Sequence, residues 1–194
     1  MTDFDQVRRA LLACRRCREL FGYEPQPVVQ GNAHSKIFQI SQAPSKTVHL
    51  THKPFNDLSG QRLIHDWYQI SQADFYNPDY FYITSMANCF PGKATGGGDR
   101  KPPQICAQIW LERQMDLVDN DIYILIGRYA AGYFFPMKRF EELVFSDQII
   151  RGKKTFILPH PSPLNMKWFR DHLEFEASRV AAIQKIIHAV LRKK

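Results

Sequence analysis

Short, almost continuously apolar segments recur along the chain and alternate with stretches whose apolar residues have helical spacing. Four of the apolar segments have the length and composition of buried strands, and they lie at residues 36–40, 80–86, 122–126 and 155–158. Strands that are apolar on both faces are typical of a parallel sheet that is covered by helices on each side. The pattern therefore predicts a buried, mostly parallel sheet of four strands.

Between the strands, apolar residues recur every three or four positions, as expected for helices that pack by one face. Helices are predicted over residues 2–21, 61–73, 104–118, 127–134 and 171–192. Gly22 is a stop signal for the first of them. The remaining segments at residues 23–35, 46–60 and 91–103 are polar or rich in Pro and Gly, which predicts loops.

The alternation of strands and helices predicts a single three-layer α/β/α domain over residues 1–194, with a central four-stranded sheet. In such sheets, ligands bind beyond the carboxyl ends of the strands. Three segments rich in polar residues occur there: residues 41–45, the loop around Cys89, and residues 160–165. We therefore expect the functional residues to come from these three segments.

The net charge narrows the class of partner. The formal charge is +7 and the sequence pI is about 9.3, which favours a polyanionic partner, nucleic acid above all. No amino-terminal run resembles a signal peptide, and no segment approaches the roughly 18 apolar residues of a membrane span. We expect a cytoplasmic monomer that does not associate with a membrane.

The four cysteines form two spaced pairs. Cys14 and Cys17 form a C-x2-C motif, and Cys89 and Cys106 have 16 residues between them. In a reducing compartment such a pattern indicates metal ligands rather than disulfides, and four thiolates can complete one site. The spacing alone leaves zinc and an iron–sulfur cluster both open.

Several short motifs follow one another in a fixed order along the chain. They are Ala43-Pro44 after the first strand, Pro54-Phe55 followed by Asp57-Leu58-Ser59-Gly60, the strand Ile83–Ala87 running into Asn88-Cys89, and His160-Pro161-Ser162-Pro163-Leu164-Asn165. Together with the cysteines, they resemble the uracil-DNA glycosylase superfamily, specifically its iron–sulfur branches, families four and five. The resemblance covers nearly the whole chain. It implies an enzyme of base excision repair that hydrolyses the N-glycosidic bond of uracil, or a related deaminated base, in DNA.

An enzyme that cuts a base from DNA must first flip the nucleotide into a pocket. Phe55 is the candidate aromatic face for the flipped base, although one of 14 phenylalanines could also simply fill the core. Leu164, on a loop bounded by prolines, could fill the gap left in the duplex. The alternative for Leu164 is a loop residue packed inward.

The resemblance assigns the chemistry to Asp57 and His160. Asp57 would stabilise the sugar cation and orient water, and His160 would donate to the carbonyl of the leaving base. The structural alternatives are that Asp57 caps a helix beginning near Ser59, and that His160 is a satisfied structural histidine. Both alternatives stay open at this point.

The base itself would be held by the turn after the first strand and by the end of the second. Gln42 and Ala43 are expected over the base, and Ser85 stands where family four has the asparagine that reads uracil. Asn88 is a second candidate for that role. Because this asparagine is absent at position 85, bases such as hypoxanthine or xanthine are also candidate substrates. The chain departs from the family pattern at Ser41 and Ser45 as well, where glycines are usual.

The resemblance also implies DNA contacts and a cofactor. Ser162 would bind a backbone phosphate, and the three cations Lys93, Arg100 and Lys101 in the loop between the last two cysteines would face the DNA. A 4Fe–4S cluster, or zinc as the alternative, would be held by Cys14, Cys17, Cys89 and Cys106 in a structural role.

Two other functions are compatible with the sequence. The altered turn at residues 41–45 and the missing asparagine are compatible with a member of the superfamily that binds DNA or a nucleotide without efficient excision. The cysteines alone are compatible with an unrelated, metal-stapled interaction module, which would show no salt-dependent affinity for DNA.

Overall fold

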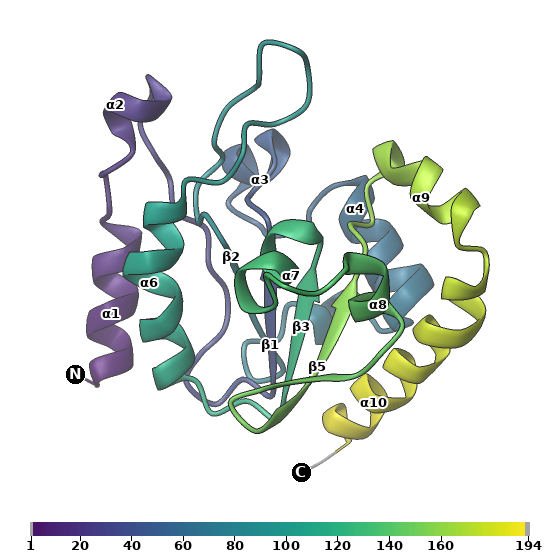
Figure 1. The fold of residues 1–194 in the computed structure, drawn as a ribbon. Coiled ribbons are helices and arrows are strands. Elements are labelled where there is room, and N and C mark those ends of the chain that lie inside the picture. Colours follow the sequence, from purple (N-terminus) through teal and green to yellow (C-terminus); the bar gives the residue numbers. More distant parts are fainter. Residues whose placement is uncertain (1, 193–194) are drawn as a thin grey trace.

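The computed structural model describes residues 2–192 and contains a five-stranded sheet with the strand order β2-β1-β3-β5-β4 (Figure 1). The strands are β1 (Ile37–Ser41), β2 (Phe81–Ser85), β3 (Ile122–Ile126), β4 (Gln148–Ile150) and β5 (Lys153–Leu158). Strands β1, β2, β3 and β5 run parallel, and every residue of the first three is buried. The four predicted strands are therefore present, and their apolar composition reflects burial on both faces.

The number of strands is five rather than the predicted four. The additional strand β4 is antiparallel to β5 at the edge of the sheet. It has only three residues and its middle residue, Ile149, is 62% exposed. Such a short, half-exposed segment has too few apolar residues to stand out as a strand in the sequence.

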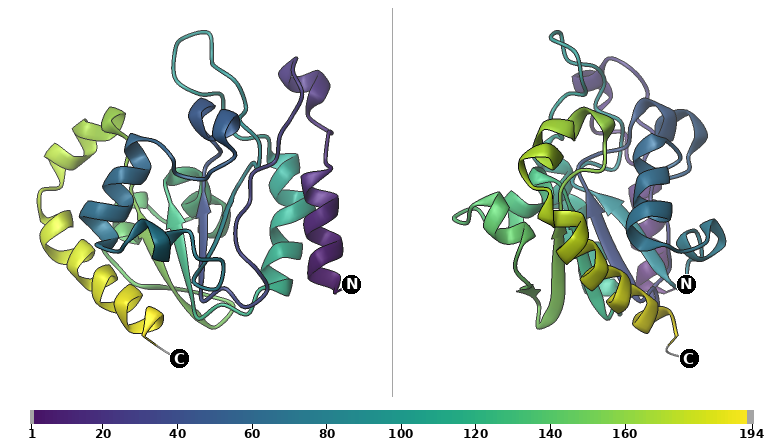
Figure 2. Two further views of the ribbon diagram at one scale, coloured as in Figure 1. Left: turned by 180° about the vertical axis from the view of Figure 1, so that it is seen from behind. Right: turned by 90° about the vertical axis from the view of Figure 1, so that its right-hand side faces the viewer.

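Helices cover both faces of the sheet, as predicted (Figure 2). The helices on one face are α1 (Asp3–Leu12), α6 (Gln104–Leu117), α7 (Arg128–Phe134) and α8 (Phe140–Val144), and those on the other are α4 (Leu58–Gln61), the π-helix η1 (Arg62–Tyr68) and α10 (Ala181–Leu191). The faces are marked by hydrogen bonds to alternate strand residues. Tyr82 and Thr84 of β2 donate to Gln114 of α6, whereas Tyr68 of η1 donates to Gln39 of β1. The helices predicted over 104–118 and 127–134 are confirmed to within one residue.

The helix predicted over residues 2–21 is interrupted, which corrects that prediction. Helix α1 ends at Leu12, and α2 (Arg18–Phe21) begins after a turn that contains Cys14 and Cys17. Arg15 donates to the carbonyl oxygens of Leu12 and Cys14 and so satisfies acceptors that a continuing helix would have used. Helix α2 does end at Gly22, which has φ +75°.

The segment predicted as a helix over 61–73 begins earlier and ends earlier. Helix α4 starts at Leu58 and runs directly into η1, which ends where Gln69 adopts φ +50°. Two short helices were missed on either side: α3 (Lys46–Thr51) lies inside the predicted loop 46–60, and α5 (Gln72–Phe75) follows η1. Both begin at a serine that accepts a backbone hydrogen bond, Ser45 and Ser71 respectively.

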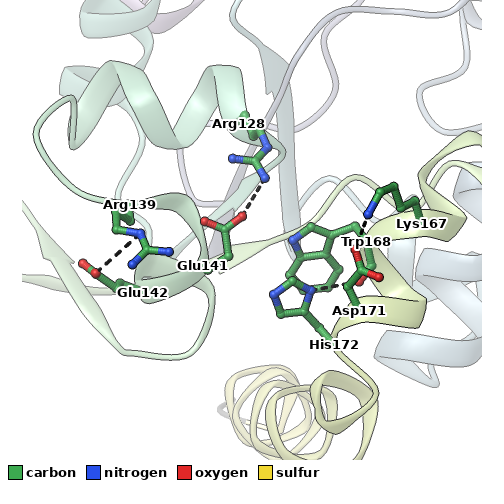
Figure 3. A network of polar contacts seen from close by, with 8 residues as sticks. All are labelled: Arg128, Arg139, Glu141, Glu142, Lys167, Trp168, Asp171 and His172. Carbon is green, nitrogen blue, oxygen red and sulfur yellow. Dashed lines mark hydrogen bonds and ion pairs between the residues drawn. The ribbon is translucent and has the colours of Figure 1, made fainter.

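The carboxy-terminal helix predicted over 171–192 begins several residues later than predicted, and a short helix that was not predicted precedes it. The 3₁₀ turn η2 (Pro163–Asn165) leads into α9 (Met166–Asp171), and the chain then leaves the helical region at His172 before the π-helix η3 (Glu176–Val180) continues into α10. The His172 ring stacks on Trp168 at 4.3 Å and is hydrogen-bonded to the Trp168 carbonyl (Figure 3). No proline or glycine occurs between Asp171 and Glu176, so no helix-breaking residue predicts this interruption.

The carboxyl ends of β1, β2 and β5 meet at one edge of the sheet, and the segments that follow them stand together there. Residues 41–45 follow β1, the cysteine-bearing loop follows β2, and residues 159–165 follow β5. Among residues 2–192, no helix has the length and apolar character needed to cross a membrane.

Candidate active site

A cavity of about 470 Å³ opens at the carboxyl ends of these strands. Most of the residues predicted to act on the base line it together with Ser162, which was predicted to bind a phosphate. They are Gln42, Ala43, Phe55, Asp57, Ser85, His160 and Ser162. Segments up to 120 residues apart in sequence therefore converge on one site, as the motifs predicted.

Asp57 lines the cavity and also caps a helix, so both interpretations of this residue are compatible with the structure. Its Oδ1 accepts a hydrogen bond of 3.1 Å from the backbone N–H of Gly60, at the start of α4. Its Oδ2 accepts a second bond of 2.7 Å from the hydroxyl of Ser45. Two donors from different segments thus fix the carboxylate at the cavity wall, although the segment between Phe55 and Ser59 is one residue shorter than in family five.

Phe55 is held in a strained backbone conformation at the same wall. Its φ is +55°, which is a rare value for a bulky residue and is often found at functional positions. Gly60 makes this conformation possible, because a Cβ on Gly60 would lie 1.6 Å from the carbonyl oxygen of Phe55. The ring makes an edge contact with Phe75 at 6.1 Å and is only partly buried. The glycine of the motif therefore has a steric reason that the sequence did not reveal.

His160 comes from the loop after β5 and is neutral at pH 7. Burial lowers its pKa below the usual 6.5, and the nearby negative charge of Asp57 opposes that shift only in part. Its Nδ1 accepts a hydrogen bond of 3.2 Å from the backbone N–H of Ser162. Since Nδ1 is an acceptor, the proton of the neutral ring is on Nε2. His160 can therefore donate one hydrogen bond from Nε2.

Two serine hydroxyls lie side by side at the ends of β1 and β2. Ser41 and Ser85 are opposite each other in the sheet register, both line the cavity, and their Oγ atoms are 2.8 Å apart. Either atom could be the donor. Ser41 was noted in the sequence only as a departure from the family pattern, and its pairing with Ser85 depends on the strand register.

The turn after β1 is fastened to the end of β2 by its backbone. The carbonyl oxygens of Ser41 and Gln42 accept hydrogen bonds from the N–H groups of Met86 and Ala87, at 2.8 and 3.2 Å. Ala43 follows in the cavity lining, and Ser45 then caps α3 through a bond of 3.3 Å from Val48. The substitution of Ser45 for the usual glycine thus supplies both a helix cap and a partner for Asp57.

A second carboxylate, which no sequence motif predicts, also lines the cavity. Asp99 belongs to the glycine-rich loop 91–103, and its Oδ1 accepts a hydrogen bond of 2.6 Å from Lys93. This ion pair is partly exposed, so its contribution to stability is small. Asp99 is the only acidic residue in loop 91–103, and this is the one signal that could have drawn attention to it.

The loop after β5 presents Leu164 to solvent. Ser162 lines the cavity, its Oγ accepts a hydrogen bond of 3.2 Å from the N–H of Leu164, and Asn165 donates to the His160 carbonyl. Leu164 is 90% exposed. It is therefore not packed inward, and it follows Ser162 of the cavity lining by two residues.

The structure places Asn88 away from this cavity, which argues against the proposal that it reads the base. Asn88 is buried, its Oδ1 accepts from Thr84, and its backbone and side-chain N–H groups donate to the Sγ of Cys106 at 3.3 and 3.7 Å. It lines a different, small cavity that also contains all four cysteines. Asn88 is therefore a neighbour of the thiols.

The four cysteines of this small cavity are free thiols with an apolar surrounding. Its wall is built by Leu11, Phe21, Ile105, Ile109 and Trp110 together with two prolines. Burial, and then the neighbouring cysteines, raise the pKa of Cys17 and Cys89. Within residues 2–192, no group of three or more His, Cys, Asp or Glu side chains is arranged to hold a metal ion.

The three cations predicted to contact DNA occupy different places. Lys93 pairs with Asp99, and Arg100 donates from Nε to the Lys93 carbonyl, so both stabilise the exposed loop. Lys101 lies beside a further cavity between α6 and α7.

The sheet, the covering helices and the cavity at the strand ends define an α/β protein with a candidate ligand site at the carboxyl edge of its sheet. The family model described as the uracil DNA glycosylase superfamily matches residues 28–186, and the chain belongs to this superfamily. The proteins named Type-4 uracil-DNA glycosylase from Saccharolobus solfataricus and Archaeoglobus fulgidus are 27% and 25% identical to it. Each alignment covers 79% of this chain, and 68% and 73% of the respective relative. The predicted membership is confirmed.

Proposed function

We propose that the protein is a DNA glycosylase that hydrolyses the N-glycosidic bond of uracil, or of a related deaminated base, in DNA. The observation that carries this proposal is the placement of Asp57 and His160 in the lining of one cavity, each fixed by hydrogen bonds from neighbouring residues. The superfamily membership and the names of the relatives support the same activity.

The reaction requires opposite charges to be stabilised at two points. As the bond between the sugar and the base breaks, its electron pair goes to the base, and positive charge develops on the sugar. The Asp57 carboxylate would stabilise the sugar cation and accept a proton from the water that attacks C1′. The Nε2–H of His160 would donate to the base carbonyl that gains negative charge.

A neutral His160 suits this role better than a charged one. Its buried position keeps the pKa low, so the donor stays uncharged at working pH, and the hydrogen bond from the Ser162 N–H fixes the tautomer. A prearranged donor needs no reorganisation when the charge develops.

Phe55 and the serine pair would set which base enters. The Phe55 ring would replace part of the stacking that a flipped base loses. Ser41 and Ser85 share one hydrogen bond, which leaves one hydroxyl proton and several lone pairs for the base. Hydroxyls can donate or accept, so we propose that the site takes uracil and also hypoxanthine or xanthine. Gln42 and Ala43 would lie against the same base.

DNA would be held along the edge around the cavity. Exposed Leu164 would enter the duplex where the nucleotide leaves, and Ser162 would contact a phosphate. Lys93 and Arg100, in loop 91–103, would add electrostatic attraction to the phosphate backbone of the DNA.

We also propose that Cys14, Cys17, Cys89 and Cys106 hold a 4Fe–4S cluster. The donor set fits: four free thiols share one cavity with an apolar wall, and two N–H groups of Asn88 point to Cys106 Sγ. Four thiolates also suit zinc, which is the alternative, and iron, sulfide and zinc analysis of protein purified without oxygen distinguishes the two. The cluster would fasten α1 and α2 to α6, outside the reaction itself.

The test is an excision assay with protein purified without oxygen. End-labelled oligonucleotides would carry uracil, hypoxanthine or xanthine, single-stranded or paired, and alkali would cleave at the resulting abasic sites. We expect cleavage at uracil and a weaker band with at least one purine. Salt-dependent binding without cleavage, in protein shown to contain its full complement of iron, would instead identify a DNA-binding member that does not excise.

A further inference from the structure

A second cavity, of about 620 Å³, lies between the amino-terminal end of α6 and α7. Figure 1 shows these two helices on the same face of the sheet. The residues that line it with polar or aromatic side chains are Lys101, Gln104, Gln108, Arg128, Tyr129 and Tyr133. The mechanism proposed above uses none of them.

The two cavities adjoin each other at the same edge of the sheet. Met86 lines the second cavity and directly follows Ser85, which lines the first. Gly127 directly precedes Arg128 and lies against His160, because a Cβ on Gly127 would be 3.7 Å from the Cβ of His160. A DNA strand whose flipped base enters the first cavity therefore passes close to the second.

The second cavity offers aromatic faces and amides. Tyr129 and Tyr133 are one turn apart on α7, and each is 39% exposed. Exposed aromatic rings in grooves that bind single strands stack on bases, whatever the base identity. Gln104 and Gln108 are exposed one turn apart on α6 and provide donors and acceptors for base edges.

The charge of this cavity also suits a nucleotide. Lys101 and Arg128 line it, and no carboxylate does so among the described residues. Arg128 is held in place by Glu141 at 2.6 Å (Figure 3), and its guanidinium lies 4.5 Å from the centre of the Phe140 ring. A guanidinium has five N–H donors, so one ion pair leaves donors for a phosphate.

We propose that this cavity binds a nucleotide that flanks the excised one on the same DNA strand. The base stacks on Tyr129 and Tyr133, and Lys101 and Arg128 contact its phosphate. The inference rests on the proposed function, since it assumes a DNA strand that crosses this edge.

A spacer scan tests the proposal without requiring excision. Oligonucleotides would carry one uracil at a fixed position, with a sugar fluorinated at C2′ so that the glycosidic bond resists cleavage, and a single base-less spacer at successive positions from it. Binding to wild type and to the double variant Tyr129→Ala/Tyr133→Ala would be measured by fluorescence anisotropy. We expect about 10-fold weaker binding for the variant, as for the loss of one stacked base. In wild type, a spacer at one particular position should weaken binding by the same factor as the double substitution does. In the double variant, a spacer at that position should weaken binding no further.

A filled cavity gives a second test that leaves the tyrosines in place. A Cβ on Gly132, between them on α7, would meet no atom within 4 Å. Gly132→Leu should therefore fold and block the cavity, again with about 10-fold weaker binding. Met137→Ala, at a residue that is 94% exposed and outside both cavity linings, is the matched control and should bind as wild type does.

The outcomes separate this inference from the proposed function. The second site is overturned, even if uracil is excised, by either of two results. One is undiminished DNA binding by both Tyr129→Ala/Tyr133→Ala and Gly132→Leu, and the other is an equal loss of binding with spacers at every position. Position-specific coupling supports the second site even if no base is excised. A surface for another protein would leave all the DNA affinities unchanged, and that result also overturns the proposal.

Discussion

The cavity with Asp57 and His160 and the cavity with the four cysteines lie at the same edge of the sheet but are organised differently. In the first, protein groups already complete the site: Ser45 and Gly60 donate to Asp57, and Ser162 donates to His160. In the second, four free thiols line one cavity whose other lining residues are mostly apolar, and burial raises the pKa of Cys89. The first is prearranged by the chain, whereas the second needs a bound cation to favour its thiolates.

Removal of the donor at His160 should have the largest effect of the changes outside Asp57. His160→Ala should lower the single-turnover excision rate by about 10²–10³-fold, as for loss of one prearranged donor to a developing anion. Affinity for uncleaved DNA should change little. Rapid-quench assays at saturating enzyme measure the first quantity and anisotropy the second. If the variant kept its excision rate and lost affinity for DNA, His160 would be a binding residue. The first cavity would then not be prearranged for the reaction, which contradicts the contrast with the cysteine cavity.

Removal of one thiol from the cysteine cavity should lower the stability of the protein. Cys17→Ser should lose iron and lower the melting temperature by about 10 °C, or about 3 kcal/mol for a chain of this size. Iron and sulfide analysis and calorimetry measure both, with metal-stripped wild type as the matched sample. Full iron content at an unchanged melting temperature would contradict the assignment of Cys17 as a ligand.

Ser45 tests whether the first cavity depends on a residue particular to this chain. Ser45→Gly restores the residue usual in the related families and keeps an acceptable helix cap, but it removes the donor to Asp57. We expect about a 10-fold lower kcat with KM nearly unchanged, because the carboxylate is less well placed. Ser45→Thr, which keeps the hydroxyl, should recover most of the rate. Equal activity of all three proteins would show that Ser45 is only a cap.

The smallest expected effect is on the pH dependence of stability. Because burial lowers the pKa of His160, the unfolded chain binds more protons there than the folded one as pH falls below 6.5. Acidification in that range therefore destabilises the wild type. In His160→Gln, the free energy of unfolding should fall less steeply between pH 6.5 and the lowered pKa, as measured by urea unfolding. An unchanged slope would indicate that His160 is not buried as described.

The sequence predicted the parallel strands and the convergence of the motifs because both depend on local apolar runs and on the general geometry of α/β sheets. It did not reveal the contacts that arise only from tertiary placement. Asp99 reaches the cavity through a long loop, and Asn88 turns toward Cys106 although it lies three residues after Ser85. The helix breaks near Cys14 and at His172 have no proline or glycine to mark them.

Asp57 carries the central claim, and it can be tested apart from its structural role. Asparagine is as good a helix cap as aspartate, whereas alanine is not. We would measure single-turnover excision of uracil and the melting temperature for Asp57→Asn and Asp57→Ala in the same preparations. The account predicts that both variants lose about 10³-fold in excision rate and that only Asp57→Ala loses stability, by about 1 kcal/mol. If Asp57→Asn excised uracil at the wild-type rate, Asp57 would be a helix cap alone, and the proposed chemistry would be wrong.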